Sequence, residues 1–227
     1  MSKKIPHNKK PFSRRPATKH AGRRILIVTE GQTEKTYFDA LRRRWKLHGI
    51  IIPKNPDCTD PVSLLAYAKK ENGVISNLNR GNYDEVWLVY DLEKPNATDR
   101  RNQSHQVKNQ IETGKKYKNF HLALSDPSFE FWYILHFEKT TKSFTGAEEV
   151  ISYLKKHLNN YRKGTLADRE LESILDRTEI AISNASWVRE QLKNSNSPAP
   201  VTDIDKLWNY TDADKNSSLR TMCFGAK

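Results

Sequence analysis

The sequence predicts an α/β protein with a mostly parallel sheet of about four strands, flanking helices and a C-terminal helical extension. Strand-like and helix-like stretches alternate four times before residue 143, which is typical of parallel sheets. Two of the strand-like runs, ILIV at 25–28 and VWLVY at 86–90, are wholly apolar, as expected of strands buried on both faces. Beyond residue 143 only helical patterns follow, which predicts the extension.

Each element follows from its own local pattern. The run at 25–28 is the first strand, and apolar residues at helical spacing predict a helix over 33–48. The other predicted elements are a strand at 50–52, a helix from Asp60-Pro61 to about residue 73, the strand at 86–90, a surface helix or ordered loop within 96–117, a strand at 120–124, a helix opening at 125–127 and running through Phe137, helices near 147–159 and 166–192, and a short piece around Leu207 and Trp208.

Charge divides the chain into an arm and a folded part. The net charge is +12, and residues 1–24 carry nine Lys or Arg and no acid, which leaves +3 for the rest. We therefore expect a disordered basic arm at 1–24, an α/β domain at 25–142 and a helical extension packed on it at 143–227. The arm suits phosphate contacts with nucleic acid, although a solubilising tail has the same composition.

Several classes of protein are excluded. The longest greasy stretch, at 129–137, is too short to span a bilayer, and the N-terminus lacks the apolar core of a secretory signal. Cys58 and Cys223 lie far apart, with no CxxC or His cluster, so we expect neither a disulfide framework nor a zinc site, and we predict a cytoplasmic protein. The phosphate-binding pattern Gx4GK[ST] of ATPases is absent.

Acids follow both apolar strands. Glu30 comes after the first, and Asp91 and Glu93 come after the strand at 86–90. The carboxyl ends of parallel strands open onto one crevice, so these side chains are expected to converge there if the strands are neighbours. Such acids repel one another, and a divalent cation removes the conflict. Ordinary loop acids are the alternative, and Glu93 could instead pair with Lys94.

Glu34 and Glu130 are two further candidates for the same site. Glu34 lies in the first turn of the helix after Glu30, where the helix dipole favours an acid whatever its function. Glu130 lies among aromatic residues, and a carboxylate there needs a partner, a helix cap or an ion. Between the first two acids, Gly31 is expected to let the chain turn tightly beside a phosphate.

Three segments resemble a known family. ILIVTEGQTEKTYFDAL, VWLVYDLE and SDPSFEFWYILHF, within 24–137, resemble in this order the signature segments of RloB-like bacterial defence proteins. The resemblance implies a divergent Toprim fold and a Mg²⁺- or Mn²⁺-dependent nuclease. It implies Glu30 as general acid/base and Asp91 and Glu93 as metal ligands, with Glu93 in place of the usual second aspartate; it also marks Glu34 and Glu130. A companion ATPase of AAA, ABC or OLD-like type in an anti-phage or abortive-infection locus is implied as well.

The predicted function is hydrolysis of DNA or RNA at this metal site, where Asp91 and Glu93 are expected to hold the ion with help from Glu30 or Glu130. The residues expected to contact phosphate are Gly31, Lys35, Lys94, Arg100, Arg101, Arg23 and Arg24. Two rivals stay open: a nucleic-acid- or ATPase-binding subunit with little or no turnover, and a hydrolase of small nucleotides. No membrane partner is expected, and a homo-oligomer is left open.

Overall fold

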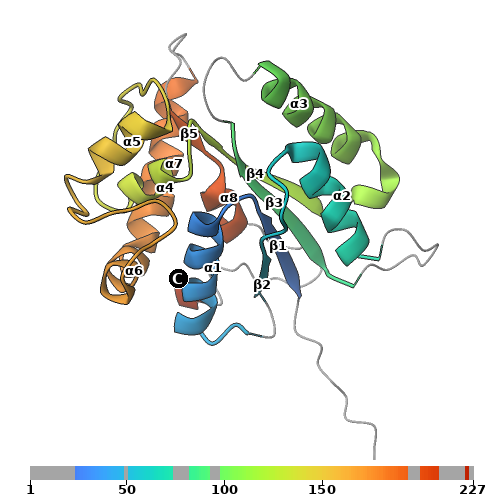
Figure 1. The fold of residues 1–227 in the computed structure, drawn as a ribbon, viewed down its shortest axis with the longest axis horizontal. Coiled ribbons are helices and arrows are strands. Elements are labelled where there is room, and N and C mark those ends of the chain that lie inside the picture. The colour runs from blue at the N-terminus through green and yellow to red at the C-terminus, as the bar shows by residue number, and fades with distance from the viewer. Residues whose placement is uncertain are drawn as a thin grey trace, which may run out of the picture.

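The fold is built on one five-stranded sheet (Figure 1). The computed structural model describes residues 24–48, 51–73, 82–92, 98–193, 200–209 and 223–224, so the basic arm lies outside the described residues except for Arg24. The strand order is β2-β1-β3-β4-β5, with the first four strands parallel and the last antiparallel to its neighbour. The prediction of an α/β fold with a mostly parallel sheet is confirmed.

The fifth strand is the main departure from the predicted sheet. The strands are β1 (Ile25–Thr29), β2 (Ile51–Lys54), β3 (Glu85–Asp91), β4 (Phe120–Asp126) and β5 (Val201–Thr202). The hydroxyls of Ser125 and Thr202 lie 3.1 Å apart where β4 and β5 pair. Two residues are too short to leave an alternation in the sequence, so the extension was expected to contain helices only.

The helices lie near the predicted positions, but the prediction that a helix opens at 125–127 is wrong, because β4 continues to Asp126 and α4 begins at Glu130. They are α1 (Gln32–Arg44), α2 (Pro61–Glu71), α3 (Thr98–Thr113), a 3₁₀ turn (Lys115–Tyr117), α4 (Glu130–Leu135), α5 (Ala147–Leu154), α6 (Asp168–Leu175), α7 (Thr178–Leu192) and α8 (Ile204–Asn209). The single helix expected over 166–192 is two helices, because the Thr178 hydroxyl donates to the Leu175 carbonyl (2.9 Å) and ends α6. None of the described helices is both long and apolar enough to cross a membrane.

Two apolar cores sandwich the sheet. Leu26 and Val28 face the side covered by α2 and α3, while Ile25 and Ile27 face the side covered by α1, α4 and the extension (Figure 1). All of these side chains are buried, which is why the strand carries no polar alternation. Each contributes about 1.5–3 kcal/mol by leaving water. The extension shares the α1 core, where Trp208 is fully buried.

Candidate active site

Strand pairing brings the first acids together. β1 and β3 are adjacent, with Thr29 opposite Val89, so both strands end at one edge of the sheet. The backbone N–H of Glu30 donates to the Val89 carbonyl (3.0 Å), and the N–H of Asp91 donates to the Glu30 carboxylate (3.1 Å). Glu30 and Asp91 are therefore neighbours, as the parallel arrangement requires.

Two helix starts add Glu34 and Glu130. Glu34 lies in the first turn of α1, immediately after β1, and Glu130 is the first residue of α4, soon after β4. Glu34 and Asp91 are 4% exposed and Glu130 is fully buried. Acids from four separate segments thus gather at the carboxyl edge of the sheet, and we call Glu30, Glu34, Asp91 and Glu130 the acid cluster.

The acid cluster is electrostatically strained. Burial, with the negative charges of Glu34, Glu130 and Glu30 acting in addition, raises the pKa of Asp91 well above its ordinary value. Burial, with the negative charges of Glu30 and Glu130 acting in addition, raises the pKa of Glu34 to about 7. Low dielectric and like charge both disfavour ionisation, so the cluster attracts protons or cations.

Two oxygens of the acid cluster are buried without a hydrogen-bond partner among the described residues. They are Oδ1 of Asp91 and Oε2 of Glu130. The other Glu130 oxygen accepts a hydrogen bond from the Tyr161 hydroxyl (2.7 Å). Unsatisfied buried acceptors are rare in folded proteins and call for a ligand or a proton.

Gly31 serves the cluster through its size. Its φ of −127° and ψ of 173° are extended values that any residue adopts, so the expectation of a special backbone conformation is wrong. A Cβ at this position would lie 2.7 Å from Oε2 of Glu34. The missing side chain therefore leaves room for the Glu34 carboxylate.

Arg100 is held by the protein at three points. Its guanidinium pairs with Glu30 and donates to the backbone carbonyls of Asp91 (2.6 Å) and Thr59 (3.0 Å). These contacts fasten the start of α3 over the ends of β1 and β3. Because its donors already serve acceptors of the chain, Arg100 orients the site before any substrate arrives.

The remaining predicted phosphate contacts are dispersed. Arg101 pairs with Asp126 (2.9 Å) and Lys35 pairs with Asp39 (2.7 Å), both near the carboxyl edge. Arg24 precedes β1 at the opposite edge of the sheet, where its guanidinium lies over the ring of Tyr83. Glu93, Lys94 and Arg23 lie outside the described residues.

The comparison with protein families decides the identity of the chain. A family model described as RloB-like protein matches residues 25–209. The chain belongs to the RloB-like family. No curated protein and no solved structure matches it. The RloB-like match covers the whole sheet, the acid cluster and most of the helical extension, so the extension is part of the family's unit.

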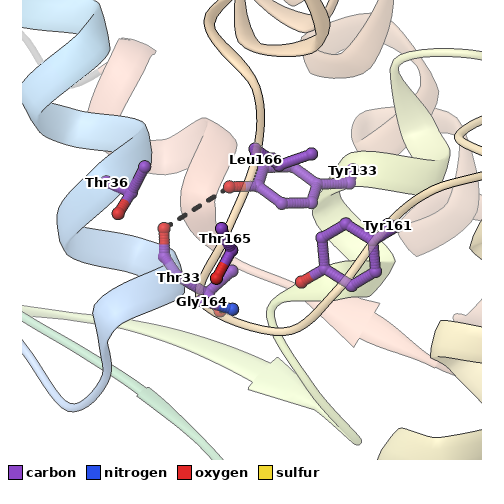
Figure 2. Close-up of a pocket in the computed structure, with 7 residues that line it drawn as sticks. All are labelled: Thr33, Thr36, Tyr133, Tyr161, Gly164, Thr165 and Leu166. Carbon is purple, nitrogen blue, oxygen red and sulfur yellow. Dashed lines mark hydrogen bonds between the residues drawn. The ribbon is translucent and has the colours of Figure 1, made fainter.

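Two residues beside the acid cluster were not singled out from the sequence. Tyr161 and Lys163 lie between α5 and α6, in a turn closed by the bridge between Arg162 and Thr165. We call residues 161–166 the extension turn. Figure 2 shows this turn against the start of α1 and against Tyr133. The one local signal is Gly164, whose φ of 77° marks a turn but says nothing of its neighbours in space.

The donor set of this RloB-like site suits a hard divalent cation, but the described residues do not form a finished metal site. Carboxylate oxygens without partners, on Asp91 and Glu130, are the ligands that Mg²⁺ accepts. Among the described residues, however, no group of three or more His, Cys, Asp or Glu is arranged to hold a metal ion. The side chain of Glu30 is already paired with Arg100.

Proposed function

We propose that this RloB-like chain is a metal-dependent nuclease that hydrolyses phosphodiester bonds of DNA or RNA. The observation that carries the proposal is the convergence of four acids from distant segments at the carboxyl edge of a parallel sheet. This edge is where ligands bind in open α/β sheets. Two unpaired buried oxygens in the same cluster give a cation something to bind.

Asp91 is the proposed centre of the metal site. Glu34 and Glu130 flank it, and Glu93 is the additional ligand that the family resemblance implies. When bound, Mg²⁺ or Mn²⁺ supplies polarisation of the scissile phosphate and a lower pKa for an attacking water. The Arg100 contact keeps the Glu30 carboxylate in place beside the Asp91 backbone.

Glu34 is the proposed proton-transfer group. Without bound metal its pKa is about 7, and a cation beside it would lower that pKa, so that Glu34 is ionised and able to accept a proton when the metal is in place. The resemblance assigned this role to Glu30, but the side chain of Glu30 pairs with Arg100 and accepts from the Asp91 N–H. An ion-paired carboxylate is better suited to orientation than to proton transfer.

The nucleic acid is the proposed substrate because of the charge of the chain. Nine Lys or Arg without an acid in residues 1–24 would add affinity for the phosphate backbone that does not depend on base sequence. We further propose, from the family resemblance, a role in anti-phage defence beside an ATPase encoded by another gene. The absence of Gx4GK[ST] from this sequence fits a division of labour between two chains.

The test is cleavage by the purified full-length chain. Plasmid DNA, single-stranded DNA and RNA are incubated with Mg²⁺, with Mn²⁺ and with EDTA, and the products are separated on denaturing gels. We expect cleavage that requires the metal and disappears in Asp91→Asn. Cleavage that persists in Asp91→Asn at the wild-type rate would trace to a contaminant and remove the assignment.

A catalytically weak binding subunit is the second candidate. It is favoured by the lack of a finished metal site among the described residues and by the Arg100–Glu30 ion pair inside the cluster. On this reading the chain binds nucleic acid or its ATPase with EDTA present and cleaves nothing. Binding without cleavage across all metals, with and without the ATPase, would favour this function over the nuclease.

A further inference from the structure

We propose that Lys163, carried by the extension turn, contacts the substrate phosphate at the mouth of the acid cluster. The proposal deepens the proposed nuclease function and rests on it. It assigns a substrate-binding role to the helical extension, which the sequence had placed outside the site.

The extension turn is fixed to the site on both sides of Lys163. The Tyr161 hydroxyl donates to Glu130 (2.7 Å), and the Gly164 N–H donates to the Thr33 hydroxyl (3.0 Å) at the start of α1. Lys163 lies between these two anchors. The turn therefore holds its backbone at a set place above the acids rather than at a variable distance.

Packing under the turn is tight. The hollow between it, α1 and Tyr133 has no room for a water molecule (Figure 2). The Tyr133 hydroxyl reaches the Thr33 carbonyl (3.4 Å) across this hollow. Gly164 adopts a φ of 77°, which side chains rarely tolerate, so the sharp reversal after Lys163 is built into the sequence.

Lys163 is exposed, and its charge acts on the acids. Its positive charge lowers the pKa of both Glu34 and Asp91, which places the ammonium near two members of the cluster from different elements. Arg100 lies deeper, with its side chain 14% exposed. Lys163 thus lies where an incoming anion would reach the site, whereas Arg100 is a more deeply buried part of the site.

A cation at this point answers a specific electrostatic need. A nucleic-acid phosphate must approach four carboxylates, and its own charge opposes that approach. A lysine ammonium is a compact charge that binds phosphate oxygens without fixed geometry, which suits a mobile contact at the entrance. Lys163 would offset the repulsion at the moment of binding.

The test compares Lys163→Gln with Arg162→Gln. Both variants remove one exposed positive charge from the same turn, but of the two only Lys163 is among the main charges that act on Glu34 and Asp91. Binding of a short fluorescein-labelled DNA, and of its RNA equivalent, is measured by anisotropy with Ca²⁺ in place of Mg²⁺. The rate of cleavage is measured in parallel with Mg²⁺.

We expect Lys163→Gln to weaken binding about fivefold to tenfold, and to reduce the salt dependence of binding by about one phosphate contact. Lys163→Arg should restore most of the affinity, while Arg162→Gln should stay within about twofold of the wild type. The value of kcat/KM should fall with the affinity, mainly through KM.

The outcomes separate the two proposals. If the wild type cleaves and the two glutamine variants behave alike, the role of Lys163 is wrong and the nuclease stands. If the wild type binds but never cleaves, the nuclease is wrong, and the anisotropy comparison alone decides the role of Lys163. Absence of both binding and cleavage overturns both.

Discussion

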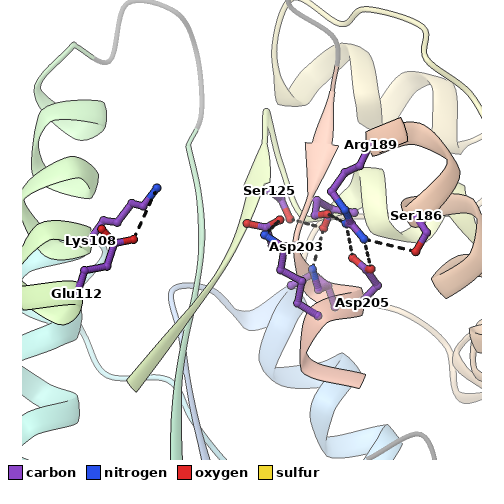
Figure 3. Close-up of polar contacts among 10 residues, drawn as sticks. Lys108, Glu112, Ser125, Ser186, Arg189, Asp203 and Asp205 are labelled. Atoms are coloured by element: carbon purple, nitrogen blue, oxygen red, sulfur yellow. Dashed lines mark hydrogen bonds and ion pairs between the residues drawn. The ribbon is translucent and has the colours of Figure 1, made fainter. Parts of the chain in front are cut away.

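Asp91 and Asp205 are two buried acids with opposite surroundings. Asp205 is 1% exposed, and its carboxylate accepts hydrogen bonds from both terminal nitrogens of Arg189, one of them at 2.6 Å. Arg189 also donates to the Thr202 carbonyl (2.9 Å; Figure 3). Asp91, which is 4% exposed, keeps one carboxylate oxygen without a partner among the described residues and has other acids around it. The same residue type at similar depth is satisfied in one place and strained in the other.

The difference separates an acid that holds the fold from one that, in our proposal, binds the metal ion. The Arg189–Asp205 pair ties α7 to the segment of β5 and α8, so its charges are matched inside the chain. Among the described residues no guanidinium pairs with the Asp91 carboxylate in this way, although a mutation to asparagine would remove its charge at no loss of volume. Retaining a strained acid makes sense where the charge is used in function.

Asp91→Asn is expected to give the largest effect. Cleavage should fall at least about a thousandfold, because the central ligand of the proposed metal site is lost. Without metal, the variant should be at least as stable as the wild type, because a disfavoured charge has been removed. Chemical denaturation in EDTA measures the second effect. Loss of activity together with a large loss of stability would make Asp91 a structural residue.

The pH dependence of the free energy of unfolding should reveal the raised pKa of Glu34. Its folded pKa of about 7 lies above its ordinary value of 4.5, so the stability that the protonated Glu34 contributes is fully present below pH 4.5 and is lost as pH rises through about 7. Across that window the metal-free protein should lose about 3 kcal/mol relative to Glu34→Gln. The charged groups that act on Glu34 are Glu30, Asp91, Glu130 and Lys163.

Denaturant unfolding in EDTA at about pH 5 and about pH 8 checks this prediction. The difference between wild type and Glu34→Gln should grow with pH, and Mn²⁺ should recover the loss only at the higher pH. Parallel pH profiles for the two proteins would mean that Glu34 titrates normally in the folded state.

Asp205→Asn should do the reverse of Asp91→Asn. Breaking the pair leaves Arg189 without its buried partner, so the free energy of unfolding should fall by about 2–3 kcal/mol, while cleavage well below the melting temperature stays near the wild-type rate. Glu112→Gln is the matched control, because Glu112 and Lys108 form an exposed pair at 3.8 Å (Figure 3). Its effect should stay within about 0.5 kcal/mol. Equal stability losses would contradict the comparison.

Tyr161→Phe should have the smallest effect. It removes the donor to Glu130, so the carboxylate loses its orientation and cleavage should fall about tenfold. Tyr153→Phe removes a similar bond, 2.6 Å to Glu138, away from the cluster and should leave cleavage unchanged. Comparing kcat and thermal unfolding of the two variants separates positioning from packing. Identical losses of activity would argue against a role for Tyr161 in the site.

The parts of the site that follow strands could be predicted from the sequence. Wholly apolar runs identify β1 and β3, and parallel pairing then requires Glu30 and Asp91 to share an edge. The division between α6 and α7 could not be predicted from the sequence, because it depends on one side-chain hydrogen bond, from the Thr178 hydroxyl to the Leu175 carbonyl. The extension turn was missed for a related reason. Its contacts join Tyr161 to Glu130 and Gly164 to Thr33, and no local pattern records such distant pairs.

Roles within the cluster were also beyond local patterns. Arg100 looked like a phosphate contact from its position after Asp91, yet its donors face Glu30 and two backbone carbonyls. That pairing shifts proton transfer from Glu30 to Glu34 in our proposal. The assignment of proton transfer depends on which carboxylate pairs with the Arg100 guanidinium. The packing of α3 against the strand ends determines that partner.

Calorimetric titration with Mn²⁺ at about pH 8 tests the shared site most directly, because it needs neither the substrate nor the ATPase. We predict binding to the wild type and to Asp205→Asn with equal affinity, and at least about tenfold weaker binding to Asp91→Asn. Mn²⁺ that binds Asp91→Asn as tightly as the wild type, or binds neither protein, would contradict the account.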